Sequence, residues 1–457
     1  MVGFRIGGLI GAVCAASLAV AACGRSVPVP FAEPAVSGTA PRHDSTAARA
    51  AAPLMPAGAG KEAPAPSGAR LSKLIAAGKA HYVPGRLVVG FKEPASPIGT
   101  LALPGARVDT ADGGGELAIV EVTPGGEADA LAKLGANPAV AFVERDFRVK
   151  VNDFSPGAAA IRKPKPGPVP GLIPNDPDFG KHWGLLKINA PGAWAINKGS
   201  PRVTVAVLDS GIDLDHEDVS RKVLASRNFT RTASVDDVVG HGTHVAGIVA
   251  AATNNGTGVA GTGFNVTLLN AKVVDDDGYA DVALVANGII WAVNKGAKVL
   301  NMSFAAEAGS QGLERAVKYA ARRGAILVAS AGNDGAATAM FPAAYSETIA
   351  VGATDSDDKR AEFSNYGARW VDVAAPGDAI YSTGPNQPNG FALHPYDYLS
   401  GTSMSAAFVS GQAALLFSKP AFLPVRWRIE RTATRVAGTG TDHRYGRVDL
   451  LKSVKTL

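Results

Sequence analysis

Short apolar runs alternate with longer periodic stretches along the second half of the chain. The runs are VTVAVLD (203–209), AKVLNMS (297–303), AILVAS (325–330) and TIAVGA (348–353). Such runs are typical of strands covered on both faces. Between them, 279–296 and 313–324 have helical spacing and each ends at a glycine, a usual helix stop. The alternation predicts an α/β fold of three layers, with a mainly parallel sheet and helices on both faces.

A different pattern precedes this region. HYVPGRLVVGFK (81–92), GELAIVEV (115–122) and AVAFVER (139–145) are predicted strands, and EADALAKLG (127–135) a helix. Together they predict a small α+β domain over 81–151.

Two segments of unusual composition flank that small domain. Residues 23–80 are mostly Ala, Pro, Gly and Ser, which bury too little apolar surface to offset the entropy of ordering. We expect them to form a flexible tether. Residues 152–174 are again rich in Pro and Gly, and predict a linker before a large domain at 175–457.

The first 22 residues have the layout of an export signal. Arg5 precedes an apolar run that is too short and too rich in Gly and Ala for a membrane span. The run ends in VAAC (20–23), which resembles the lipobox of bacterial lipoproteins. That resemblance implies lipid on Cys23 and a membrane-anchored protein of the bacterial cell envelope. The alternative is an ordinary signal peptide cleaved after Ala22, with Cys23 merely nearby and the protein secreted.

Composition narrows the chemistry further. The formal net charge of +5 over 457 residues is explained by solvated Lys and Arg, so no nucleic-acid partner is expected. The only two cysteines, Cys14 and Cys23, stand near the N-terminus. The body of the chain therefore has no thiols for a disulfide framework or a thiolate zinc cluster.

Four polar residues stand where an α/β domain positions its chemistry, near strand ends and helix starts. Asp209 closes the run 203–209, although it could instead cap the next turn. His241 opens a predicted helix. Ser403 stands at a helix N-terminus, where backbone N–H groups can stabilise an oxyanion, or it is a plain N-cap. Asn333 follows the run 325–330 and could donate to an oxyanion, or it is a turn residue.

The stretch GHGTHVAGIVA (240–250) leaves two interpretations open at this stage. His241 and His244 could form a metal pair, or one could be a base and the other a buried neighbour. A zinc site needs a third ligand and an activating carboxylate, and the familiar helical pair is spaced as H-E-x-x-H. Here Gly242 and Thr243 stand between the histidines.

Four segments in order, VLDSGI, HGTHVAG, AGN and GTSMS, resemble those of the subtilisin-like serine proteases. The order Asp, His, Ser is the one known for subtilisin. The resemblance implies that Ser403 is the nucleophile, His241 the base and Asp209 its partner. It also implies that Asn333 and the Ser403 N–H bind the oxyanion, and that His244 is structural. NDPDFGKHWGLLKINAPGAWAINKGS (175–200) extends the likeness to thermitase-type members over nearly all of 175–457.

The thermitase resemblance implies one structural Ca²⁺ site built from oxygen ligands, the kind that calcium prefers. The matching residues are Asp176, Asp218, Asn255 and the carbonyl groups of Ala252, Thr257 and Val259. The alternative is a plain turn rich in Asn and Gly. A second family site is expected to be missing, because Asn228 and Arg231 stand at its ligand positions.

The chain departs from the family in two places. After Ser403 the family's Pro and His are replaced by Ala407 and Phe408, yet Ala keeps helix propensity and the helix should survive. At the expected substrate edge, where the family has SLGG, stand Ser303, Phe304 and Ala305. Two Gly-to-Ala changes, at Ala305 and Ala306, add methyl groups where substrate would approach, which predicts a narrower or shifted entrance to the specificity pocket. Asp334 could favour basic groups at the pocket rim.

The domain at 81–151 resembles the inhibitor-like propeptide of subtilases. We therefore expect an exported serine endopeptidase, made as a self-processing zymogen that its own propeptide inhibits, acting on protein or peptide substrates as a monomer. The cut is expected in the linker 152–174. The alternatives are a catalytically weak surface scaffold of the same fold, and a peptide ligase that uses the same site.

Overall fold

The computed structural model describes residues 68–93, 101, 103–110, 115–151, 155–156, 170–390, 392–419 and 422–456. All of these belong to one compact unit, Met55–Leu457. The predicted export signal, Cys23 and most of the predicted tether lie outside the described residues.

The central feature is an eight-stranded sheet in which every pairing is parallel. In spatial order its strands are β16 (Gly446–Arg447), β13 (Val373–Pro376), β12 (Thr348–Thr354), β11 (Ile326–Ser330), β10 (Val299–Met302), β6 (Thr204–Asp209), β8 (Thr267–Lys272) and β7 (Val223–Asn228). The four apolar runs in the sequence correspond to β6, β10, β11 and β12.

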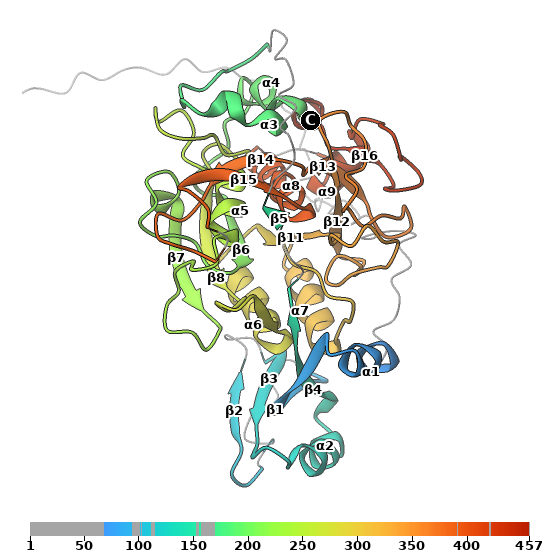
Figure 1. Cartoon of the computed structure of the whole chain (residues 1–457). Helices are drawn as coiled ribbons and strands as arrows, with labels where there is room; N and C mark the ends of the chain where they lie inside the picture. Colours follow the sequence, from blue (N-terminus) through green and yellow to red (C-terminus); the bar gives the residue numbers. More distant parts are fainter. Residues whose placement is uncertain are drawn as a thin grey trace, which may run out of the picture. The chain divides into compact units, whose positions relative to one another are not determined.

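Helices cover both faces of this sheet (Figure 1). Alternate residues of β6 point to opposite sides, so Ala206 and Leu208 join one core cluster, whereas Val205 and Val207 join the other. The first cluster includes α6 (Val282–Asn294) and α7 (Gln311–Arg322). The second includes α5 (His241–Ala250) and α8 (Thr402–Phe417). The three-layer α/β prediction is confirmed.

Four short helices also belong to the described part of the catalytic domain. They are α3 (Trp183–Lys187), α4 (Ala190–Trp194), α9 (Val425–Arg431) and α10 (Leu450–Lys455). A second, three-stranded sheet has the order β14 (Ile380–Thr383), β15 (Tyr396–Ser400) and β5 (Ser155–Pro156).

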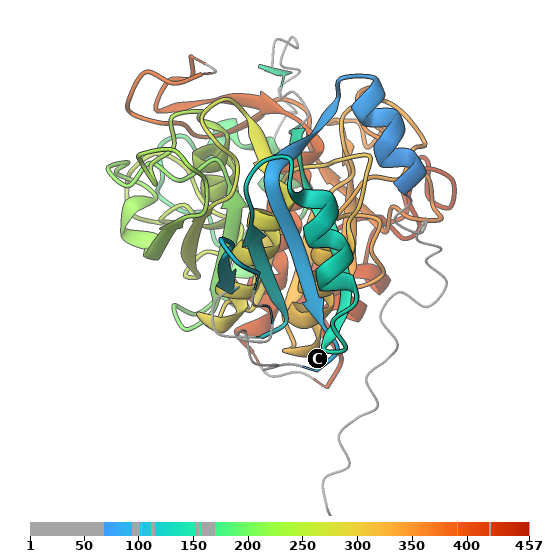
Figure 2. The same ribbon diagram turned by 90° about the horizontal axis from the view of Figure 1, so that it is seen from below.

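The N-terminal domain is an antiparallel sheet with its own core. Its strands β2 (Arg107–Thr110), β3 (Leu117–Glu121), β1 (Ala80–Phe91) and β4 (Val140–Lys150) lie in that order. One face packs on α2 (Glu127–Gly135), as Figure 2 shows, through Leu87, Val89, Leu134 and neighbours. The other face, with Val88, Ile119 and Phe147, joins the core that contains α6 and α7.

Three elements differ from the sequence-based expectation. Helix α1 (Gly68–Ala76) falls within the segment expected to be a tether, because Leu71, Leu74 and Ile75 form an apolar stripe that packs on the core. Strand β9 (Tyr279–Asp281) takes the first residues of a predicted helix and pairs with β4. Strand β5 lies within the predicted linker.

In the part of the chain that the structure describes, none of the helices combines the length and apolar character required to cross a bilayer.

Candidate active site

The carboxyl ends of three neighbouring strands bring the predicted residues together. Strands β11, β10 and β6 are adjacent and parallel, so their ends meet at one edge of the sheet. Asp209 is the last residue of β6, Ser303 follows β10, and Asn333 stands three residues after β11. Asp209 lies on its strand, and Ser303 and Asn333 lie in the loops that directly follow theirs.

Asp209 and His241 form a short, buried hydrogen bond. Nδ1 of His241 lies 2.6 Å from Oδ1 of Asp209, and the two residues are 0% and 2% exposed. The same carboxylate oxygen accepts the backbone N–H of Ser210 at 2.8 Å. The bond at Nδ1 fixes the orientation of the imidazole ring and leaves Nε2 as the nitrogen available for proton transfer.

The start of α5 is held against the end of β6 by a second buried carboxylate, Asp237. Its Oδ1 accepts the Ser210 hydroxyl at 2.9 Å and the Gly240 N–H at 2.8 Å. Its Oδ2 accepts both the N–H and the hydroxyl of Thr243. The Ser210 hydroxyl in turn accepts the N–H of Gly242. Asp237 therefore fixes the turn that carries His241.

Gly242 is required for this close approach. A Cβ atom at this position would lie well inside contact distance of the Gly211 carbonyl oxygen and 3.1 Å from Cβ of Asp209. A larger residue would push α5, and His241 with it, away from Asp209.

Ser403 lies in the first turn of α8 and is coupled to Ser303. The Ser403 hydroxyl donates to the Ser303 carbonyl, and the Ser303 hydroxyl donates to the Ser403 carbonyl, each at 3.0 Å. Asn301 donates to the Ser303 hydroxyl at 2.8 Å and accepts from Ser410 on α8 at 2.8 Å. The end of β10 and the start of α8 are thus linked through Ser303, which was predicted only as part of the substrate edge.

Asn333 is oriented by the residue that precedes Ser403. Its Oδ1 accepts the N–H and the hydroxyl of Thr402, each at 2.9 Å. Because Oδ1 accepts these two bonds, Nδ2 is the end left to donate. A Cβ atom on Gly401 would lie 3.4 Å from Nδ2, which places the amide nitrogen beside the start of α8. A threonine beside a serine gives no sequence signal for this role of Thr402.

Helix α8 is continuous through Ala407 and Phe408, the two residues that replace the family's Pro and His after Ser403. It runs from Thr402 to Phe417 with Ala407 and Phe408 fully buried, so the expectation that the helix survives is confirmed. Phe408 packs edge-on against the ring of His182, with ring centroids 5.3 Å apart. Burial lowers the pKa of His182 to about 3, and this histidine is therefore neutral.

His244 is a buried neighbour with partners of its own. Its Nε2 lies 3.1 Å from the Ile380 carbonyl and 3.2 Å from the Asp397 carbonyl. Burial lowers the pKa of His244 to about 3. His241 and His244 thus point their bonding nitrogens to different partners, an aspartate for one and backbone carbonyls for the other.

The N-terminal domain ends at this edge of the sheet. Strand β4 pairs with β9 in the register Arg148↔Asp281, Val149↔Ala280 and Lys150↔Tyr279. The next residue, Val151, donates its N–H to the Gly278 carbonyl at 2.9 Å. Beyond it, β5 pairs Ser155 with Ser400, only three residues before Ser403. Segments on both sides of residues 152–154 are therefore tied to the edge that carries Ser403.

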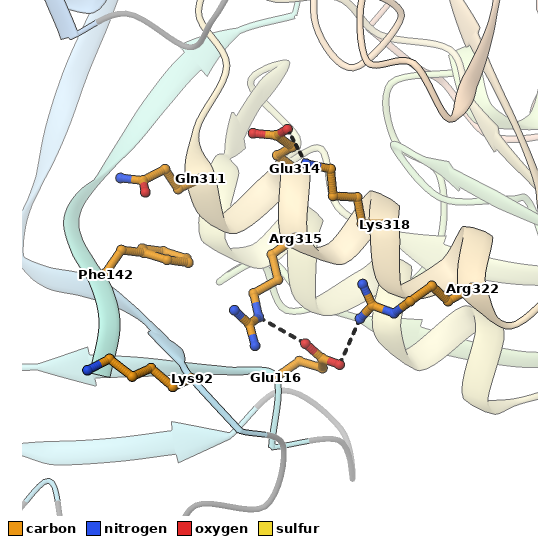
Figure 3. Close-up of a pocket in the computed structure, with 8 residues that line it drawn as sticks. All are labelled: Lys92, Glu116, Phe142, Gln311, Glu314, Arg315, Lys318 and Arg322. Atoms are coloured by element: carbon orange, nitrogen blue, oxygen red, sulfur yellow. Dashed lines mark hydrogen bonds and ion pairs between the residues drawn. The ribbon is translucent and has the colours of Figure 1, made fainter. Parts of the chain in front are cut away.

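Charged groups also join the N-terminal domain to the catalytic domain, and these contacts form the interface between the two. Glu116 of the N-terminal domain accepts from Arg315 and Arg322 of α7, each at 2.9 Å, across a cavity of about 480 Å³ (Figure 3). Two carboxylates on β4 bind the N-termini of helices in the catalytic domain. Glu144 accepts the N–H groups of Gln311 and Gly312 in α7, and Asp146 accepts the N–H of Ala283 in α6. Carboxylates at helix N-termini are stabilised by the helix dipole.

Asp146 is fully buried in this interface. Its Oδ2 accepts Arg86 Nη1 at 3.1 Å, and the same nitrogen donates to Asp281 at 2.7 Å. Burial outweighs these partners and raises the pKa of Asp146 to about 7. Burial also raises the pKa of Glu144.

The predicted calcium residues also come together. Asp176 accepts the N–H groups of Asn254 and Asn255 at 2.8 and 3.0 Å. Asp218 accepts the N–H of Val259 and the side-chain amide of Asn255, both at 2.9 Å. Burial, with the nearby charge of Asp176, raises the pKa of Asp218 to about 7. Two buried carboxylates thus converge on the loop 252–259.

Comparison with known proteins agrees with this arrangement. A family model described as the subtilase family matches residues 200–448. The chain belongs to the subtilase family. A second model, the fervidolysin N-terminal prodomain, matches residues 71–146. The chain is therefore a thermitase-type serine endopeptidase preceded by a prodomain, which indicates a zymogen.

Individual relatives show how far the likeness extends. Thermitase from Thermoactinomyces vulgaris is 44% identical over 285 residues, which are 62% of this subtilase and 99% of thermitase. A thermophilic serine proteinase from Bacillus sp. strain AK1 is 36% identical over 390 residues, 82% of this chain and 88% of the relative. A crystal structure also matches, that of fervidolysin from Fervidobacterium pennivorans, described as a keratinolytic enzyme related to subtilisin. The TM-score is 0.69 at 28% sequence identity, and the match covers 82% of this chain and 61% of the fervidolysin chain.

Proposed function

We propose that this subtilase hydrolyses peptide bonds with Ser403 as nucleophile, His241 as general base and Asp209 as the residue that orients the imidazole. The observation that carries the proposal is the 2.6 Å bond between His241 Nδ1 and Asp209 Oδ1, both buried at the edge of the sheet where Ser403 lies in the first turn of α8. Each residue has a plain structural alternative on its own, but turn or cap roles do not account for their meeting at one edge.

The proposed reaction uses the groups that surround Ser403 and His241. The Ser403 hydroxyl gives up its bond to the Ser303 carbonyl and transfers its proton to Nε2 of His241 while Oγ attacks the substrate carbonyl. Asp209 stabilises the imidazolium through Nδ1–H. Nδ2 of Asn333 and the N–H of Ser403 donate to the oxyanion. His241 then returns the proton to the leaving amine, and water hydrolyses the acyl enzyme in the reverse sequence.

The precursor is self-processing in this proposal. The pairing of Val149 to Val151 with Gly278 to Ala280 resembles the way a peptide substrate adds a strand to a sheet edge. The chain is tied to the same edge again at Ser155, so the cut within the 152–174 linker is proposed between Val151 and Ser155. After the cut, the prodomain would stay in place as an inhibitor, held by Glu116, Glu144 and Asp146.

One structural calcium ion is proposed at the loop 252–259. Asp176 and Asp218 are 4% and 1% exposed, and a cation between them would offset the cost of two buried carboxylates. The carbonyl groups of Ala252, Thr257 and Val259 and the Asn255 side chain would complete an oxygen shell of the kind calcium prefers. The ion would fix Asp176 to the loop and take no part in catalysis.

The proposed location follows from the sequence alone. Export is assigned to residues 1–22 and a lipid anchor to Cys23. Growth with a radiolabelled fatty acid should label the parent chain and leave a Cys23→Ser variant unlabelled, whereas labelling of both would remove the lipid assignment.

A serine-reactive fluorophosphonate probe tests the proposed chemistry. The processed enzyme should be labelled at Ser403, with no labelling of a Ser403→Ala variant. A folded parent that is not labelled would favour the scaffold alternative. Supplying an amine acceptor with a peptide ester would reveal the ligase alternative as transpeptidation products.

A further inference from the structure

The turn before β9 carries a carboxylate that binds an arginine of the prodomain. Arg148 on β4 forms an ion pair with Oδ2 of Asp275, and its Nε lies 3.9 Å from Oδ1 of Asp281. Its guanidinium also lies over the ring of Tyr279, 4.8 Å from the centroid, a cation–π arrangement. Three side chains of the catalytic domain thus contact one prodomain side chain.

Asp275 is held in place by its own turn. Its Oδ1 accepts the N–H groups of Asp277 and Tyr279, at 3.0 and 2.9 Å, which leaves Oδ2 for the guanidinium. A bridge between Val274 and Ala280 closes the turn. All of these residues belong to the catalytic domain, so the carboxylate is already oriented when the prodomain departs.

The same turn holds the backbone of the bound strand. Gly278 accepts the N–H of Val151, and Ala280 pairs with Val149. A peptide that replaces the prodomain strand would use the same backbone bonds. The side chain of that peptide which takes the place of Arg148 would then face Asp275. It stands three residues before the peptide residue that Gly278 binds.

Charge at this position changes when the prodomain leaves. In the precursor Asp281 is paired with Arg86 at 2.7 Å, and Asp275 with Arg148. Both arginines belong to the prodomain. A cavity of about 220 Å³ is lined by Arg148 and by groups of the catalytic domain. Among the described catalytic-domain groups that line it, three are carboxylates, Asp275, Asp277 and Asp281, and one is a guanidinium, Arg231.

We propose that Asp275, with Asp281 and Tyr279, forms a substrate subsite that selects arginine or lysine three residues before the residue bound by Gly278. The inference rests on the proposed protease function and names a substrate class for it: unfolded peptides with a basic residue upstream of the cut. The subsite acts through binding of a remote side chain, which raises kcat/KM without touching the reacting atoms.

Internally quenched peptides cut by the processed enzyme test the proposal. The parent peptide has the sequence of residues 144–158, ERDFRVKVNDFSPGA, and its variants carry Ala or Glu at the place of Arg148. We expect kcat/KM for the Arg peptide to exceed that for the Ala peptide about fivefold to tenfold, as for a partly exposed ion pair with a cation–π contact. The Glu peptide should be cut more slowly than the Ala peptide.

Two enzyme variants locate the effect. Asp275→Asn keeps the acceptor for the turn but loses the charge, so the Arg-to-Ala ratio should fall to within about twofold of one. Asp277→Asn makes the same change in charge two residues away and should keep most of the ratio. Because each ratio is taken within one enzyme preparation, differences in active fraction cancel.

Equal cleavage of the Arg and Ala peptides by the parent would overturn the subsite while leaving the protease function intact. An equal loss of preference in Asp275→Asn and Asp277→Asn would replace the subsite by a diffuse acidic field. If no peptide is cut by a processed, folded enzyme, the proposed function fails and the subsite fails with it.

Discussion

Thr402 donates both its N–H and its hydroxyl to Oδ1 of Asn333, each at 2.9 Å. The two bonds settle which end of the amide is left to donate, and they join the proposed oxyanion donor to the residue next to the proposed nucleophile. The Thr402 hydroxyl also accepts the N–H of Gly332 at 3.0 Å, which fixes the loop that carries Asn333.

Replacing Asn333 by Ala should lower kcat about 10²- to 10³-fold and leave KM nearly unchanged, because the lost bond forms only in the transition state. Thr402→Ala should lower kcat by a smaller factor, since one orienting bond remains, and Thr402→Ser should restore it. Steady-state kinetics on a chromogenic peptide measure each variant. An Asn333→Ala enzyme with normal kcat would remove this residue from the mechanism.

Asp209→Asn tests the orientation of the imidazole. Asn occupies nearly the same volume but can favour the wrong tautomer of His241, and kcat should drop about 10⁴-fold. The precursor of this variant should also remain uncut. Circular dichroism is the control for folding, and near-normal activity in the folded variant would contradict the assigned role of Asp209.

Removal of calcium should destabilise the catalytic domain. At 100 times the dissociation constant, a bound ion contributes about 2.7 kcal/mol, so adding a chelator to a Ser403→Ala precursor should lower Tm by roughly 5–10 °C. The active-site variant prevents autolysis during the measurement.

The matched variant for the calcium prediction is Asp218→Asn. It should have a low Tm that neither calcium nor chelator moves. A Tm of the Ser403→Ala precursor that is indifferent to the chelator would argue against the ion.

The prodomain should be held more tightly at pH 6 than at pH 8. Burial raises the pKa of Asp146 from 3.8 to about 7 in the assembled precursor, so the assembled form takes up a proton. The stabilisation that this proton uptake gives to the assembled precursor is fully present below the ordinary pKa of the carboxyl group. It is lost as the pH rises through about 7. Glu144, whose pKa burial also raises, contributes in the same direction. The charged groups facing Asp146 are Arg86 and Asp281.

Native-state amide exchange in β1 and β4 of the Ser403→Ala precursor measures this effect. After correction for intrinsic rates, protection should be about tenfold lower at pH 8 than at pH 6, and Asp146→Asn should flatten the dependence. Protection that is higher at pH 8 than at pH 6 would contradict the prediction.

Local patterns in the sequence were enough to predict much of the fold and to place the candidate site residues near strand ends and helix starts. The apolar run that forms β6 ends at Asp209, and a parallel sheet places such ends together, so the meeting of Asp209, Ser303 and Asn333 follows from the pattern. The family motifs then assign roles that no spacing could give.

Features that depend on distant partners were not predicted. Tyr279–Asp281 looked like the start of a helix, but those residues pair with β4 from a domain more than a hundred residues earlier. Asp237 stands in an acidic loop with no periodic signal, and only the folded contacts with Ser210 and Thr243 reveal its position under His241. Helix α1 was missed because the Ala- and Pro-rich composition around it hides three apolar residues at helical spacing.

The central claim, that Ser403 works with His241 and Asp209 on a strand delivered by the prodomain, is tested most directly by following self-cleavage. Residues 24–457 are expressed with and without Ser403→Ala, and both are examined by gel and N-terminal sequencing. The account predicts that only the parent is cut, at a bond between Val151 and Ser155. Cleavage of both versions at the same bond, or a folded parent that stays whole and ignores unfolded casein, would contradict it.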